Sequence, residues 1–122
     1  MRTFRIAIAQ MNPTVGDIDG NVRLIAAWLR EAKKAKADLV TFPELAITGY
    51  PPEDLLLKPR FVADNRKALQ EIARHCRGLA AIVGCVSERD GVDSKQARSS
   101  VVSAGAHELY NAAAVFADQR LI

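Results

Sequence analysis

The sequence of 122 residues contains few cysteines and no long hydrophobic run. Its two cysteines, Cys76 and Cys85, have neither the spacing of a metal site nor the number that a disulfide framework needs. A membrane-spanning helix needs roughly 18 consecutive apolar residues, and the apolar stretches here are far shorter. Residues 1–10 also lack the length and cleavage site of a signal peptide. We therefore expect a cytoplasmic protein with no membrane partner and no disulfide.

The chain also has little excess of one charge sign over the other. The chain has 17 Lys and Arg against 14 Asp and Glu, a net charge of +3. The densest basic run, Lys33, Lys34 and Lys36, falls at the end of an expected helix, where it complements the helix dipole. His75 and His107 share no metal-ligand spacing with other residues. This pattern predicts neither nucleic-acid binding nor a metal site.

What the chain does contain is an alternation of strand and helix patterns. Residues 4–11 form an apolar run that ends at Asn12-Pro13, and a run that is apolar on both faces is typical of a central, covered strand. Asn21 can cap the helix that follows. Apolar periodicity predicts helices at residues 22–36 and 61–76, and strands at residues 37–42, 79–86 and 109–116.

The last third of the chain has a different texture. Residues 91–108 are small and polar without a clear period, so we expect a long irregular loop there. Asp118-Gln119 is a turn candidate that would join residues 109–116 to a final antiparallel strand. Because strands alternate with helices, the earlier part of the sheet should be parallel. The sequence predicts one domain with an α/β fold, whose sheet has mixed edges and is cut short.

Glu44 is the main candidate for chemistry. It lies one residue past Pro43, at the carboxyl end of an expected strand, and ligands of open α/β sheets bind beyond that end. Its neighbours Phe42, Leu45 and Ala46 are apolar, so we expect a partly desolvated carboxylate, the environment that suits a general base. A surface glutamate that merely follows a strand is the alternative, and the pattern alone leaves both open.

The other polar candidates carry weaker signals. Cys76 and Cys85 fall on apolar faces and are expected to be small core residues rather than nucleophiles. Tyr50 follows Gly49 in a loop near Glu44, where it either shapes a pocket or packs as an ordinary aromatic residue. Glu53 and Asp54 are expected to cap a short helix.

Four segments together resemble the nitrilase superfamily of carbon–nitrogen hydrolases. They are IAQMNPTVGDIDGN at 8–21, FPELAITGYPPEDLLLKPRF at 42–61, IVGCVSE at 82–88 and LYNAAAVFADQRLI at 109–122. The Pro-Glu-Leu element is common to the superfamily. NPTVGD and TGYPPEDLLL resemble, more narrowly, the N-terminal amidase domain of bacterial glutamine-dependent NAD+ synthetases. The resemblance covers nearly the whole chain except residues 91–108.

This resemblance implies a four-layer αββα sandwich, of which residues 1–122 would form only the first strands and two helices. It implies a Glu-Lys-Cys triad in which Glu44 is the general base, and it places Tyr50 near the glutamine pocket. The parent enzyme would hydrolyse glutamine and use the ammonia, with ATP and Mg²⁺, to convert nicotinate adenine dinucleotide to NAD+. A homo-oligomer is the expected assembly.

The same resemblance also indicates what is missing. The family's lysine and cysteine would lie beyond residue 122, and the synthetase domain is absent. None of Lys33, Lys58, Lys67 and Lys95 occupies a matching place, and neither does Cys76 or Cys85. We therefore expect the chain alone to bind no cofactor and to be inactive. Two alternatives stay open: another nitrilase-type amidase, or a non-catalytic truncated paralogue.

Overall fold

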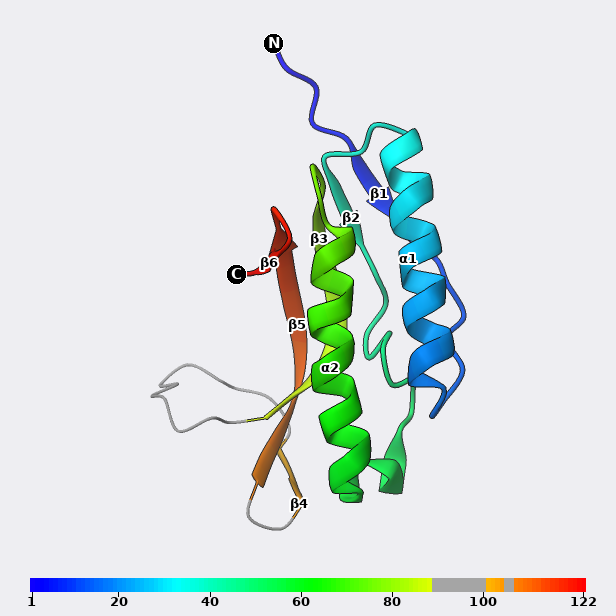
Figure 1. Ribbon diagram of the computed structural model, residues 1–122, viewed down its shortest axis with the longest axis vertical. Coiled ribbons are helices and arrows are strands. Elements are labelled where there is room, and N and C mark those ends of the chain that lie inside the picture. The colour runs from blue at the N-terminus through cyan, green and yellow to red at the C-terminus, as the bar shows by residue number, and fades with distance from the viewer. Residues whose placement is uncertain (89–100, 105–106) are drawn as a thin grey trace.

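The computed structural model describes residues 1–88, 101–104 and 107–122, which form one sheet with two helices on one of its faces (Figure 1). The elements in chain order are β1 (Ile6–Ile8), α1 (Ile18–Lys34), β2 (Leu39–Thr41), the 3-10 helix η1 (Glu53–Leu57), α2 (Pro59–His75), β3 (Ala80–Glu88), β4 (Val101–Ala104), β5 (His107–Ala117) and β6 (Arg120–Leu121).

The sheet has a parallel part and an antiparallel part. The strand order is β1-β2-β3-β5-β4, with β6 also paired to β5. β1, β2 and β3 are parallel, and β5 runs antiparallel to β3, β4 and β6. The turn between β5 and β6 consists of Asp118 and Gln119, whose φ angles of 49° and 63° suit a tight hairpin. The predicted α/β fold with mixed edges is confirmed.

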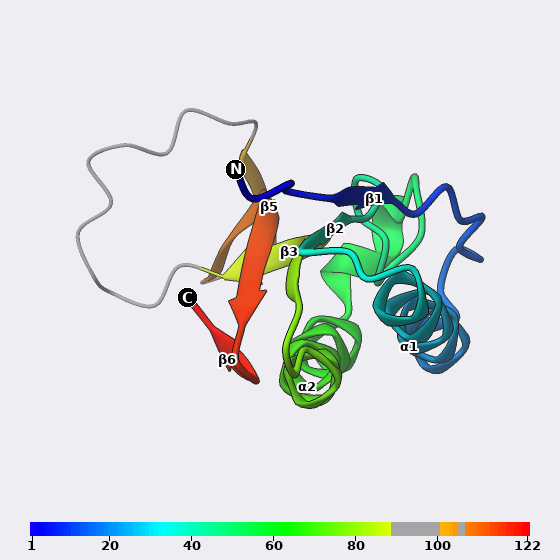
Figure 2. The ribbon, with the colours of Figure 1, turned by 90° about the horizontal axis from the view of Figure 1, so that it is seen from above.

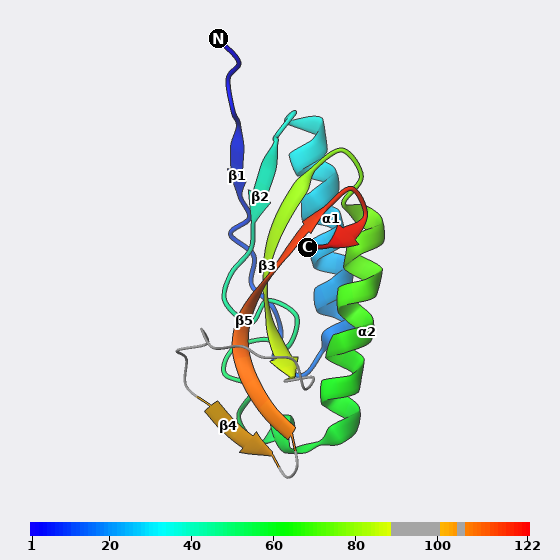
Figure 3. The same ribbon diagram turned by 90° about the vertical axis from the view of Figure 1, so that its left-hand side faces the viewer.

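The two helices bury the core against a single face of the sheet (Figures 2 and 3). Ile25 and Leu29 of α1 and Ile72 of α2 are almost fully buried, together with Val40 of β2 and Phe116 of β5. On each helix the buried side chains recur at helical spacing, so that one stripe of each helix is removed from water. Neither helix in the described part of the chain is long and apolar enough to cross a bilayer.

The opposite face of the sheet, here called the open face, keeps apolar side chains in contact with solvent. Ile6 and Ile8 of β1 are 56% and 79% exposed, and Val115 of β5 is 38% exposed. The prediction that residues 4–11 form a central strand is therefore wrong, because β1 pairs only with β2 among the described strands and forms an edge. The run is apolar, as read from the sequence, but within the described part of the chain Ile6 and Ile8 on its outer side remain exposed.

Two local predictions also need correction. Asp17, not Asn21, is the N-cap of α1, since its side chain accepts a hydrogen bond from the backbone N–H of Gly20 at 2.9 Å. The end of the predicted irregular loop is strand instead: β4 forms at Val101–Ala104 and pairs with the start of β5. Residues 89–100 and 105–106 lie outside the described residues.

Candidate functional site

Glu44 lies where the parallel ladder of β2 stops. Beyond β2, the N–H of Phe42 still donates to the carbonyl of Ile82 at 2.9 Å, but Pro43 has no N–H to continue the ladder. The chain then turns, with Leu45 at a φ of 48° and the N–H of Gly49 bonded to the Leu45 carbonyl. Glu44 therefore begins a turn at the carboxyl edge of the parallel strands, as its position after Pro43 indicated.

A glycine in β3 makes room for this turn. A Cβ atom at Gly84 would lie 2.3 Å from the carbonyl oxygen of Pro43 and 2.4 Å from the backbone nitrogen of Leu45. Any side chain there would push the turn away from the sheet. Gly84 stands inside an otherwise apolar strand, and a glycine in that setting is a sequence signal of close backbone approach. We did not recognise it from the sequence.

The turn borders a cavity of about 430 Å³. Glu44 lies on one side of it, Tyr50 lies on the loop that follows, Glu53 begins η1, and Val86 and Asn111 come from β3 and β5. The structure thus brings together Glu44 and Tyr50, the two residues singled out from the sequence. Tyr50 is 63% exposed, so it stands at the rim and is not packed as an ordinary core aromatic residue.

Asn111 contacts Glu44 directly, although the two residues are 67 positions apart. Its side-chain nitrogen Nδ2 donates a hydrogen bond to Oε1 of Glu44 at 2.5 Å. Sequence reasoning missed this residue. A possible signal was present, because Asn111 is the one amide in the apolar run of residues 109–116.

The expected partial burial of Glu44 is not seen. Glu44 is exposed, whereas its neighbours Leu45, Ala46 and Ile47 are all buried. The apolar side chains of the turn pack inward, and they leave the carboxylate on the cavity side. Neighbours in sequence were therefore a poor guide to the surroundings of this side chain.

Asn21 joins the two loops that carry the most specific motifs. Its Oδ1 accepts from the N–H of Thr14 at 2.8 Å, and its Nδ2 donates to the carbonyls of Thr14 and Ile47 at 2.8 and 2.9 Å. The N–H of Gly16 also donates to the carbonyl of Thr48 at 2.9 Å. Asn21 is only 2% exposed, and its bond to Ile47 is buried, so this amide fixes the loop that follows Glu44 to the loop that contains Thr14.

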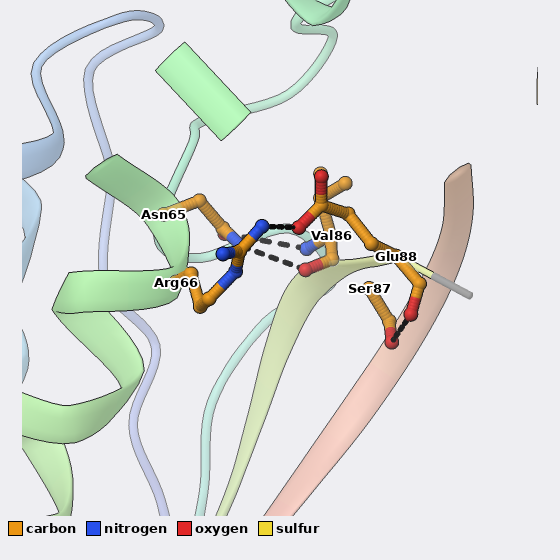
Figure 4. Close-up of polar contacts among 5 residues, drawn as sticks. All are labelled: Asn65, Arg66, Val86, Ser87 and Glu88. Carbon is orange, nitrogen blue, oxygen red and sulfur yellow. Dashed lines mark hydrogen bonds and ion pairs between the residues drawn. The ribbon is translucent and has the colours of Figure 1, made fainter. Parts of the chain in front are cut away.

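Polar contacts from α2 hold the end of β3 that forms part of the cavity wall (Figure 4). The buried Asn65 donates to the carbonyl of Val86 at 2.6 Å and accepts from its N–H at 3.4 Å. The next residue, Arg66, forms an ion pair with Glu88. Two consecutive residues of one helix thus tie down the strand segment that faces Glu44.

The cysteines have no place in this cavity. Neither Cys76 nor Cys85 lines it, and both are core residues, as predicted. Burial raises the pKa of each thiol to about 11, so each is protonated at neutral pH and a poor nucleophile.

The described lysines that the sequence offered as candidates do not border this cavity. Lys33, Lys58 and Lys67 do not line the cavity, and Lys95 lies outside the described residues. Within the described part of the chain, no three His, Cys, Asp or Glu side chains cluster closely enough to bind a metal ion.

Glu44 thus lies at a strand end beside a cavity in an α/β domain. A comparison of the sequence with protein families shows which family has this chain as a member. The profile of the family described as carbon-nitrogen hydrolase matches residues 5–122. The chain belongs to this carbon-nitrogen hydrolase family. Among solved structures, an amidase of the nitrilase superfamily from Nesterenkonia superposes with a TM-score of 0.59 and 30% identity, over 68% of this chain and 32% of the amidase.

A particular branch of the family matches over almost the whole chain. The glutamine-dependent NAD(+) synthetase of Thermotoga maritima is 39% identical over 124 residues, which cover 100% of this chain and 19% of the synthetase. The structure of the glutamine-dependent NAD+ synthetase from Acinetobacter baumannii, in complex with ADP, superposes with a TM-score of 0.81 and 32% identity, over 98% of this chain and 20% of that one. The chain thus spans about a fifth of the length of these relatives.

Proposed function

We propose that this chain is the part of a glutamine amidase domain that supplies the general base, Glu44, within a glutamine-dependent NAD+ synthetase. The single observation that carries the proposal is the position of Glu44, at a strand end and beside a cavity that also has Tyr50 on its wall. The match over 98% of the chain to a synthetase, against 68% for the amidase, supports this branch over a free-standing amidase.

The chemistry of amide hydrolysis explains why a carboxylate is needed there. An amide is a poor electrophile, so a thiolate nucleophile, a base and a charge stabiliser act together. In the proposed reaction, a cysteine supplied from outside the present residues loses its proton to Glu44. Its sulfur then bonds to the amide carbon of glutamine, while a lysine stabilises the oxyanion.

The remaining steps return the proton. The carbon–nitrogen bond breaks, the proton held by Glu44 passes to the leaving nitrogen, and ammonia departs from a glutamyl thioester. Glu44 then takes a proton from water, whose oxygen bonds to the thioester carbon. The carbon–sulfur bond breaks to release glutamate, and the proton passes from Glu44 to the sulfur, which restores the thiol and the base. In the parent enzyme, this ammonia would serve the ATP-dependent amidation of nicotinate adenine dinucleotide to NAD+. Tyr50 is proposed to border the glutamine site.

The decisive test uses the protein made from the complete gene. Changing Glu44 to Ala should abolish NAD+ formation with glutamine as the nitrogen source but leave synthesis from added ammonium intact, since only the hydrolysis step needs the base. Glutamine-dependent synthesis that survives Glu44→Ala would overturn the proposal. The 122-residue chain alone should release no ammonia from glutamine above its own Glu44→Ala control.

A non-catalytic role is the second candidate, because neither cysteine of the chain lines the cavity. It predicts a gene that stops soon after residue 122 and a product that unfolds cooperatively as an isolated chain. Reading the following codons separates this candidate from the amidase proposal.

A further inference from the structure

We infer that Asn111 is a positioning residue for Glu44: its amide holds one carboxylate oxygen in place, so that the other is presented to the proton that the base accepts. The inference rests on the proposed role of Glu44 as a base. Its evidence is the hydrogen bond from Nδ2 of Asn111 to Oε1 of Glu44, made by two residues that both border the cavity.

Glu44 needs such a partner because its packing does not fix its side chain. Its backbone is placed by the close approach of Gly84 to Pro43 and Leu45, but the side chain is exposed and has several rotatable bonds. An exposed glutamate samples several rotamers, and a base must be held close to its productive geometry to act. The bond from Asn111 supplies that restraint from another strand.

Asn111 itself is supported by regular structure. It lies within β5, where it pairs with Val86 of β3 in the antiparallel register. The backbone of Val86 is in turn held by Asn65 of α2 through bonds of 2.6 and 3.4 Å. Contacts therefore run from α2 through β3 and β5 to the Glu44 carboxylate. A side chain on such rigid elements is held more precisely than one on a loop.

An uncharged amide is suited to holding the Glu44 carboxylate in place. Its nitrogen can only donate, so it can hold an oxygen of the carboxylate while it adds no charge of its own. A lysine or arginine at position 111 would hold the carboxylate as an anion far more strongly. It would then resist the proton transfer on which the proposed reaction depends.

The kinetic test uses the full-length protein. Asn111→Ala should lower kcat for glutamine hydrolysis roughly 10- to 100-fold, the size expected when a catalytic group loses its alignment. KM for glutamine should stay nearly constant, as should synthesis from ammonium. Asn111→Gln, which keeps an amide donor, should recover part of the lost kcat. Ala113→Ser, two residues further along the same strand, is the matched control and should behave as wild type.

A spectroscopic test on the present chain does not depend on turnover. The side-chain NH₂ resonances of Asn111 should shift in Glu44→Ala, which removes the acceptor. They should stay in place in Glu53→Ala, which changes another acidic residue of the same cavity. Unshifted Asn111 resonances in Glu44→Ala would show that the contact is not formed in solution and would overturn the inference.

The two proposals fail in distinguishable ways. If Glu44→Ala abolishes glutamine hydrolysis while Asn111→Ala leaves kcat unchanged, the role of Asn111 is refuted and the function of Glu44 stands. If Glu44→Ala has no effect, the proposed function falls, and the positioning role falls with it. A KM increase without loss of kcat in Asn111→Ala would assign Asn111 to substrate binding instead and would also overturn the inference.

Discussion

Gly84 and Pro43 lie so close together that a Cβ atom on the glycine would be 2.3 Å from the carbonyl oxygen of the proline. β3 passes directly beneath the turn that begins at Glu44. The location of the candidate base therefore depends on a residue that performs no chemistry and lies 40 positions away in sequence.

Gly84→Ala should displace the Glu44 turn. Because the clash is with backbone atoms, which cannot rotate away, we expect a loss of roughly 1–3 kcal/mol in the free energy of unfolding and shifted amide resonances at residues 43–45. Urea unfolding and ¹H–¹⁵N spectra measure the two effects. Gly78→Ala is the control: φ there is 68° with open space around the Cβ position, so it should destabilise by backbone strain without moving the turn.

Asn21→Ala should destabilise the fold by separating the two motif loops. It leaves the N–H of Thr14 and the carbonyl of Ile47 without their Asn21 partner. The Ile47 carbonyl is buried, and a buried group left unsatisfied costs roughly 1–3 kcal/mol. The exposed Asn12→Ala should change stability by less than about 0.5 kcal/mol. Equal effects of the two substitutions in urea unfolding would contradict the assigned role of Asn21.

Asp38 should make stability depend on acid pH. The backbone N–H of Arg5 and then the side chain of Arg2 hold the pKa of Asp38 below its ordinary value of 3.8. A pKa that is lower in the folded than in the unfolded state stabilises the fold at any pH above the ordinary, unfolded-state value. This contribution is lost as the pH falls through the folded-state pKa. The stability difference between wild type and Asp38→Asn should therefore be constant near neutrality and shrink below pH 3.8.

Thermal unfolding between pH 2.5 and 7 measures this difference. Asp54→Asn, an exposed aspartate in η1, is the control for removing one negative charge. A difference between wild type and Asp38→Asn that persists unchanged at the acid end would refute the interpretation.

The two cysteines should react slowly with alkylating reagents in the folded chain. With each pKa raised to about 11 by burial, the thiolate fraction at pH 8 is on the order of one in a thousand, and the thiolate is the reactive form. Iodoacetamide labelling followed by mass spectrometry should give little modification in buffer and two adducts in denaturant. Rapid labelling of either thiol in buffer would show that it is not in the core.

The open face should drive association of the isolated chain. Ile6 and Ile8 remain exposed on an edge strand, and exposed apolar edges tend to pair with other copies. We expect the apparent mass in size-exclusion chromatography to rise with concentration, and Ile8→Lys to reduce that rise. Val15→Lys, in an exposed loop position, should leave it unchanged. A strict monomer at every concentration would contradict this expectation.

Much of this architecture could be predicted from local patterns. The periodicity of residues 22–36 and 61–76 indicated both helices, because burying one stripe of a helix leaves a spacing that is visible in the sequence. Pro43 marked the end of β2 for an equally local reason. The strand at residues 101–104 was missed, since its pairing with β5 comes from tertiary contact and not from its own small, polar composition.

The sequence by itself determined the alternation of strands and helices, the burial of both cysteines and the position of Glu44 just past a strand end, because each depends on residue type and short-range spacing. Only the tertiary structure decided that β1 is an edge strand, that Asn21 joins two loops instead of capping a helix, and that Asn111 contacts Glu44. Those relationships join residues far apart in the chain. Their energies depend on which backbone groups and surfaces the fold brings together, and no local pattern records that.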